Sequence, residues 1–169
     1  MASRLRRFNA YLVVALLSMC CAGCQSMKKK EASTFRVHLE VTRDGTEKNA
    51  PVPVYRQNPI YVNVENAPFL TEAHISRASV MDALGSFQIM IQFDRRGTWL
   101  LEQYSTAHRG RRIAIFSQFG HVRWLAAPVM NKRITDGLLV FTPDATREES
   151  ERIVVGLNTV AKESQKNNP

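Results

Sequence analysis

Residues 87–108 read FQIMIQFDRRGTWLLEQYSTAH and predict one strand followed by one helix. Over 87–93, large apolar side chains occupy every second position, which is the period of a half-buried strand. Asp94 follows and can cap a helix over about 95–108. Small and apolar residues then recur at helical spacing and predict the helix face that packs against the strand: Gly97, Leu100, Leu101, Tyr104 and Ala107.

Similar patterns on both sides predict further strands and a second long helix. The expected strands cover about 35–42, 60–64, 75–81, 112–119, 122–127 and 138–141. Thr146 and Glu149 form a capping box before a helix that runs to about Lys162, and Gly156 within it indicates close packing against the sheet. Three prolines within 46–59 predict a loop or an edge segment there. The expected fold is α+β, with a mostly antiparallel sheet and two longer helices packed on one face.

The N-terminus has the pattern of a secretory signal. Three arginines precede the apolar run YLVVALLSM over 11–19, and small residues follow it. Only fourteen residues separate the start of this run from the polar Gln25. A helix that spans a bilayer needs about 20 apolar residues, so a retained membrane anchor is the weaker interpretation.

The segment Cys21-Ala22-Gly23-Cys24 resembles the lipobox of bacterial lipoproteins. In that family a peptidase cuts before the cysteine that carries the lipid, and small residues precede the cut. The resemblance implies a signal peptide over 1–23, a lipidated Cys24 that anchors the chain in the membrane, and a flexible tether over 24–33. Cys21 stands where the family usually has leucine, and an ordinary cleaved signal is the alternative. Gln25 is not the aspartate that retains some lipoproteins at the inner membrane, so it favours the outer membrane.

Composition and motifs narrow the chemistry that the chain can perform. All three cysteines lie within residues 20–24, so the mature chain would have neither an internal disulfide nor a cysteine metal cluster. The chain lacks the metalloprotease, phosphate-loop and serine-hydrolase motifs, and each of its four histidines, including the outward His38, is expected at the surface. We therefore expect no enzymatic activity, no metal and no small-molecule cofactor; an unrecognised hydrolase is the alternative. The export signal also argues against nucleic acid as the partner of this basic chain.

From about Pro68 to Ala161, the order of elements resembles the head subdomain of the first periplasmic domain of SecD and SecDF, auxiliary subunits of the bacterial protein-export machine. The matching pieces are PFLTEA at 68–73, the spacing of Phe93, Gly97, Leu101 and Ser105, IAI at 113–115, APV at 127–129, ITDG at 134–137, FT at 141–142 and EE at 148–149. The transmembrane part of those proteins has no counterpart here. The resemblance implies their head fold and contact with polypeptide, without a proton-driven motor. It also implies a domain over 68–163. The residue pattern places strands and a loop at 34–67 before it, and the tail at 164–169 is expected to fray.

The sheet face turned away from the helices is the candidate binding surface. Alternation places Met90 and Phe116 on it, and Phe119 and Trp124 extend it as an apolar patch. Three arginines at its rim would favour acidic partners: Arg111, Arg112 and Arg123. In the alternative, the strands at 35–41 and 60–64 cover this face and complete an ordinary core.

These observations favour a lipid-anchored module of the bacterial cell envelope on the periplasmic side. It would contact exported polypeptides or an envelope protein complex. A purely structural, membrane-tethered module is the alternative.

Overall fold

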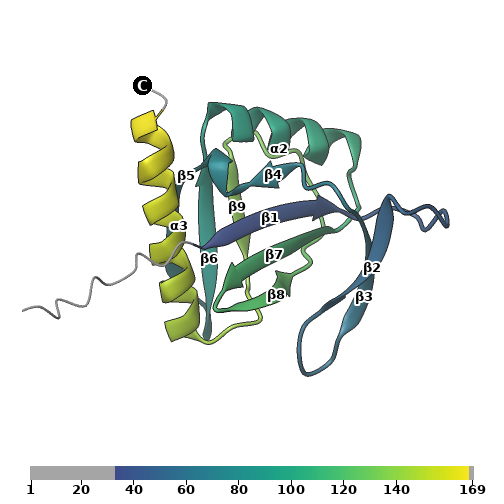
Figure 1. Cartoon of the computed structure of the whole chain (residues 1–169), viewed down its shortest axis with the longest axis horizontal. Helices are drawn as coiled ribbons and strands as arrows, with labels where there is room; N and C mark the ends of the chain where they lie inside the picture. The colour runs from purple at the N-terminus through teal and green to yellow at the C-terminus, as the bar shows by residue number, and fades with distance from the viewer. Residues whose placement is uncertain (1–32, 168–169) are drawn as a thin grey trace, which may run out of the picture.

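The computed structural model describes residues 33–167 (Figure 1). Its strands pair in antiparallel fashion, and two long helices flank them, so the α+β prediction is confirmed. The elements in chain order are β1 (Thr34–Leu39), β2 (Asn49–Val54), β3 (Ile60–Glu65), β4 (Leu70–Thr71), the 3-10 helix η1 (Glu72–His74), β5 (Ile75–Ala83), β6 (Ser86–Phe93), α2 (Arg95–Ala107), β7 (Ile113–Phe119), β8 (His121–Ala126), β9 (Leu138–Phe141) and α3 (Arg147–Asn167).

The strands are divided between two sheets and a separate ribbon. One sheet has the order β4-β1-β7-β8, the other has the order β5-β6-β9, and β2 pairs with β3 in a two-stranded ribbon. β1 pairs with β7 along its whole length, from Thr34 opposite Gln118 to Leu39 opposite Ile113. Because β1 lies between β4 and β7, the N-terminal strand shares one core with residues 68–163.

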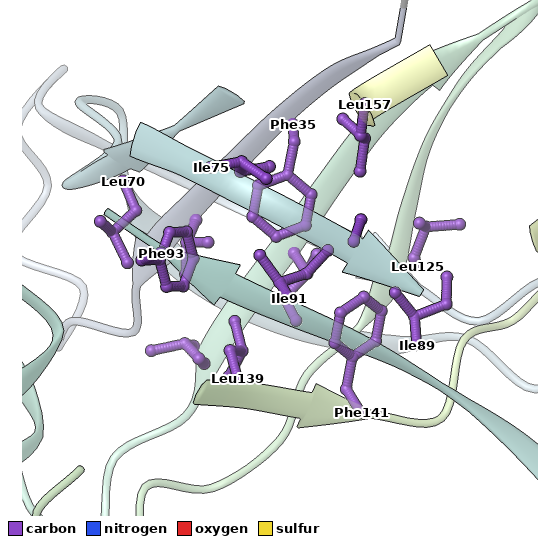
Figure 2. Packing of buried hydrophobic residues seen from close by; sticks show 14 of the residues in the cluster. Phe35, Leu70, Ile75, Ile89, Ile91, Phe93, Leu125, Leu139, Phe141 and Leu157 are labelled. Carbon is purple, nitrogen blue, oxygen red and sulfur yellow. The ribbon is translucent and has the colours of Figure 1, made fainter. Parts of the chain in front are cut away.

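The main core lies between the two sheets, whose strands cross steeply in Figure 1. Phe35 of β1 is fully buried, and its ring lies 6.4 Å from that of Phe93 on β6 and 6.5 Å from that of Phe141 on β9. Figure 2 shows these rings around Ile91, with Leu157 of α3 reaching the same cluster. The apolar face of the strand at 87–93 therefore meets helix residues, as expected, and also the inner face of the second sheet.

Helix α2 begins where the sequence predicts. The carboxylate of Asp94 accepts a hydrogen bond from the Gly97 amide at 2.6 Å. A Cβ atom at Gly97 would lie 2.9 Å from the Cβ atoms of His74 and Phe93, so only glycine fits at this crossing. Leu101 is fully buried, as the helical spacing predicts.

The predicted packing face of α2 is wrong at one position. Ala107 is exposed, and the buried position near this end of the helix is Ser105. The Ser105 hydroxyl accepts a hydrogen bond from the Ile134 amide at 2.9 Å. A polar side chain can therefore be buried there, because it anchors the loop that follows β8.

Helix α3 lies along the free edge of β5 (Figure 1). The Asn158 amide group accepts a hydrogen bond from the Ala78 backbone amide at 2.8 Å and donates one to its carbonyl at 2.9 Å. One side chain thus takes the place of a neighbouring strand and covers an otherwise unpaired edge. The helix runs to Asn167, past the expected end at Lys162, because residues 162–167 include strong helix formers and no proline or glycine.

The ribbon occupies an edge position, as the three prolines indicate. Pro51 and Pro53 lie on β2, which pairs only with β3. The ribbon contributes buried valines to a second, smaller apolar cluster, made of Val54, Val62, Val64, Ala114 and Ala127. No helix within residues 33–167 is both long and apolar enough to cross a bilayer.

Candidate functional site

The candidate site lies on the outer face of the β4-β1-β7-β8 sheet, away from the main core. Alternation along β1 turns Phe35 and Val37 inward and Arg36 and His38 outward. On the same outer face, Phe116 of β7 lies opposite Trp124 of β8, with ring centroids 5.3 Å apart in an edge-to-face arrangement. The Arg36 guanidinium carbon lies 6.0 Å from the centre of the Phe116 ring.

The ribbon covers only part of this face. Ala114, two residues before Phe116, is fully buried in the cluster with the ribbon valines. Phe116 and Trp124 are only half-buried. The alternative, in which the strands at 35–41 and 60–64 cover this face, is therefore correct for the strand at 60–64, which covers the part around Ala114. The strand at 35–41 does not lie over the sheet, because it is part of the sheet as β1.

A cleft remains between the ribbon and the aromatic pair. Its volume is about 250 Å³, and it is lined by Arg36, His38, Val52, Val64, Asn66, Phe116 and Trp124. The walls are aromatic rings and valines, while the guanidinium of Arg36 and the amide of Asn66 are exposed polar groups at its margin. We call this feature the aromatic cleft.

His38 is the polar group at the base of the aromatic cleft. It is only 7% exposed, so the expectation of a surface histidine is wrong. The outward alternation is right, but β3 and Trp124 cover this part of the face: the Nδ1 atom lies 2.8 Å from the Glu65 carbonyl oxygen, and the ring lies 5.1 Å from that of Trp124. Burial lowers the pKa of His38 below its ordinary value, and the hydrogen bond to Glu65 opposes this effect only in part.

Only two of the residues proposed for the patch, Phe116 and Trp124, line the aromatic cleft. Met90 lies on β6 in the other sheet, so the expectation that it shares a face with Phe116 is corrected. Phe119 packs against the main core at the end of β7, where the guanidinium carbon of Arg152 lies 5.9 Å from its ring centre.

The three arginines expected at the rim are placed elsewhere. Arg123 precedes Trp124 on β8, so its side chain points to the opposite face, where it forms an ion pair with Glu149 of α3. Arg112 donates from its guanidinium to the Ala127 carbonyl at 3.1 Å, and Arg111 donates to the Glu40 carbonyl at 3.3 Å. Neither Arg111 nor Arg112 lines the aromatic cleft.

Sequence reasoning missed the contribution of β1 and the ribbon to the site. Arg36 and His38 were recognisable as the outward positions of the strand FRVHLEVT. Val52, Val64 and Asn66 carried no such signal, because the fold of the ribbon onto this sheet depends on contacts distant in the sequence. Within the described part of the chain, no three histidine, cysteine or acidic side chains are grouped as a metal site.

Comparisons with known proteins agree with this architecture. The sequence model of the family "SecDF, P1 head subdomain" matches residues 47–161. A solved structure of "a membrane component SecDF that enhances protein export" is similar in fold, with a TM-score of 0.57 at 18% identity over 77% of this chain and 64% of that one. SecDF in the "Super-membrane-facing form" gives a TM-score of 0.55 at 19% identity, over 75% of this chain and 19% of that one.

The chain thus spans less than two thirds of each of these SecDF chains. No curated protein matches it significantly. The family match covers well over half of the sequence and includes both long helices as far as Ala161 and every strand except β1. The chain belongs to the SecDF P1 head subdomain family.

Proposed function

We propose that this chain is a periplasmic module of the cell envelope that is tethered by lipid on Cys24 and binds extended segments of exported polypeptides. The proposed binding site is the aromatic cleft. Family membership supports the link to export, because the similar solved structure is of a component that enhances protein export. The observation that carries the proposal is the edge-to-face pair of Phe116 and Trp124, whose rings are only half-buried.

The size of the aromatic cleft favours a side chain as its occupant. Its volume of about 250 Å³ lies below the roughly 300–1,000 Å³ of typical small-molecule pockets. Aromatic walls bind apolar side chains without demanding one sequence, and half-buried aromatic residues often dominate the energy of an interface. Both properties suit a module that contacts many different exported chains.

A structural, membrane-tethered module without a mobile client is the second candidate. It is favoured by the ribbon, which already covers the Ala114 side of the same face. In that case, the aromatic pair would only complete the packing of the ribbon.

Crosslinking in living cells separates these two candidates. A photo-reactive amino acid at position 116 should capture exported polypeptides. The same group at Leu84, a fully exposed apolar position at the β5–β6 hairpin tip, should not. Equal capture at both positions, or capture at neither, would count against the cleft as a binding site.

Phe116→Ser tests the same site by removing one of the two aromatic rings that line the aromatic cleft. The variant should remain folded, because Phe116 is only half-buried, and it should lose crosslinks from a photo-reactive group at Asn66 across the cleft. Val122→Ser, on the neighbouring strand but 62% exposed, should retain them. If Phe116→Ser unfolds the protein, as removal of core packing would, the structural candidate is preferred.

The lipid anchor has its own test. Radiolabelled palmitate should enter the wild-type chain and not Cys24→Ala, because the lipid would be attached at that cysteine. A single acyl chain gives only marginal attachment, so stable anchoring would require the several chains of a mature lipoprotein. Equal labelling of both proteins would remove the anchor from the proposal and leave the aromatic cleft untouched.

A further inference from the structure

Helix α2 and the loop over residues 128–137 form one continuous surface, separate from the aromatic cleft. Two contacts join them, the ion pair of Arg133 with Glu102 and the bond from the Ile134 amide to Ser105. Arg109, just after the helix, adds a third by donating to the Asn131 carbonyl at 2.9 Å. An open hollow of about 690 Å³ lies on this surface and is bordered by Trp99, Gln103, His108 and Arg133.

Trp99 is exposed although it is large and apolar. Its exposed fraction is 56%, whereas the other tryptophan, Trp124, is half-buried in the aromatic cleft. Arg95 and Arg96 precede Trp99 by four and three residues, so they lie one helical turn away on the same side of α2. The exposed ring is thus flanked by two exposed cations.

The positive charge of this surface is not neutralised within the described residues. Arg95, Arg96 and Lys132 form no ion pair there. Among the nearby acidic groups, Glu102 pairs with Arg133, while Asp94 caps α2 and Asp136 accepts a bond from the Leu138 amide. Both of these aspartates keep their charge, so the four cations of the surface exceed its three carboxylates by one.

Two basic residues at α3 differ in this respect. Arg147 pairs with Asp82 and Glu151, and Arg123 pairs with Glu149. Arg147 and Arg123 therefore carry paired charges, unlike Arg95 and Arg96.

We propose that this surface, made of Arg95, Arg96, Trp99, Lys132 and Arg133, docks on an anionic phospholipid bilayer. Tryptophan is enriched at membrane interfaces, because its ring is apolar and its N–H still finds polar partners. Arginine and lysine beside it are attracted to anionic head groups. A nucleic acid would suit the charge equally, but the secretory signal and the lipid anchor expected from the sequence favour a membrane.

The proposed tether makes such docking geometrically feasible. The residues between Cys24 and Ser33 span at most about 30 Å, so the domain would stay within its own diameter of the bilayer. This inference uses the proposed anchor only for proximity, and it involves neither Phe116 nor the cleft. The docking and the polypeptide binding can therefore fail independently.

The two tryptophans allow a direct test in the full chain reconstituted in vesicles. Trp124→Phe leaves Trp99 as the reporter, and Trp99→Phe leaves Trp124 as the matched control. In vesicles that contain phosphatidylglycerol, Trp99 emission should shift to shorter wavelength and be quenched by brominated acyl chains. Trp124 emission should change in neither respect, and in vesicles of phosphatidylcholine alone Trp99 should behave like Trp124.

Charge variants test the electrostatic part. In the Trp124→Phe background, Arg95→Gln and Arg96→Gln should each lower the docking equilibrium about fivefold, and their combination about 25-fold. Arg147→Gln, whose charge is paired on α3, should leave docking unchanged. Absence of Trp99 quenching in anionic vesicles would overturn the proposal, as would equal quenching at Trp124. Crosslinks from position 99 only to an acidic protein would also overturn it.

Discussion

Neighbouring residues on one strand serve different surfaces in this domain. Arg123 points toward α3 and pairs with Glu149, while Trp124, the next residue, points into the aromatic cleft. On β1, Phe35 is fully buried in the main core, and Arg36 contacts Phe116 on the outer face. Both faces of the β4-β1-β7-β8 sheet are therefore used, one for packing and one for the proposed site.

His38 makes the stability of the domain depend on pH. Because burial lowers its pKa in the folded state, the unfolded chain binds a proton more readily as the pH falls below about 6.5. Folding stability is therefore lost from about pH 6.5 downward, toward the pKa of the folded state. We expect the melting temperature of the wild type to fall more than that of His38→Gln between about pH 7.5 and pH 5.

The carboxylate of Asp44 does not interfere in this window. Hydrogen bonds from Thr46, and then from Asn49, lower the pKa of Asp44 to about 2, so its contribution is lost only at a far lower pH. An equal loss of melting temperature in wild type and His38→Gln would show that His38 is not the group responsible.

At the scale of single elements, the position of helix α3 is fixed by a few close contacts with β5 and with the residue before β1. Asn158 binds both backbone groups of Ala78, which fixes the height of the helix along β5. Gly156, two residues before Asn158 and so on another side of the helix, lies against Ser33, the residue just before β1. The helix therefore closes the β5 edge and contacts the beginning of the described chain at the same time.

Gly156→Ala should destabilise the domain although alanine is the better helix former. A Cβ atom at this position would lie 2.2 Å from the Ser33 hydroxyl oxygen and 3.0 Å from its backbone nitrogen. The gain in helix propensity is about 1 kcal/mol, and forced overpacking typically costs about 1–3 kcal/mol. We expect a net loss of up to about 2 kcal/mol in denaturant unfolding.

Two variants control for this interpretation. Val155→Ala, at a position that is 66% exposed on the same helix, should change stability by less than about 0.5 kcal/mol. Ser33→Gly combined with Gly156→Ala should recover part of the loss, because the nearest side-chain atoms are removed. A Gly156→Ala variant that is more stable than wild type would show that the contact with Ser33 is not tight.

The elements themselves were largely predictable from the sequence, because their signals are local. Alternation located the strand at 87–93, Asp94 marked the start of α2, and the last strand at 138–141 was predicted with its observed ends. The partners of each strand were not predictable in the same way. Alternation says which side of a strand a residue occupies and not which sheet the strand joins, and so Met90 and Phe116 were expected on one face.

At the scale of the whole molecule, the crossed sheets make the N-terminal strand indispensable to the core. Phe35 and Val37 are fully buried, and Leu39 is 4% exposed. Burial of each such side chain contributes about 1.5–3 kcal/mol, whereas the total stability of a domain is about 5–15 kcal/mol. Loss of β1 would also leave β4 and β7 without their shared neighbour.

A fragment that begins at Pro68, where the domain was expected to start from the sequence motifs, should therefore lack a cooperative thermal transition. The chain from Ser33 onward should melt cooperatively. A synthetic peptide of residues 33–42 should restore a transition to the fragment, because it can occupy the empty position between β4 and β7. Circular dichroism and size-exclusion chromatography of both forms measure these outcomes.

Removal of the ribbon provides the contrasting case, because its valines belong to the smaller cluster around Ala114. β1 and β4 are antiparallel neighbours, with Val37 opposite Leu70, so a short glycine-containing turn can replace residues 43–66. This shortened chain should still melt cooperatively, at a lower temperature, and should lose the aromatic cleft because Val52, Val64 and Asn66 are gone. If the fragment from Pro68 instead folds cooperatively on its own, then β1 is an accessory strand and residues 68–163 are an independent domain.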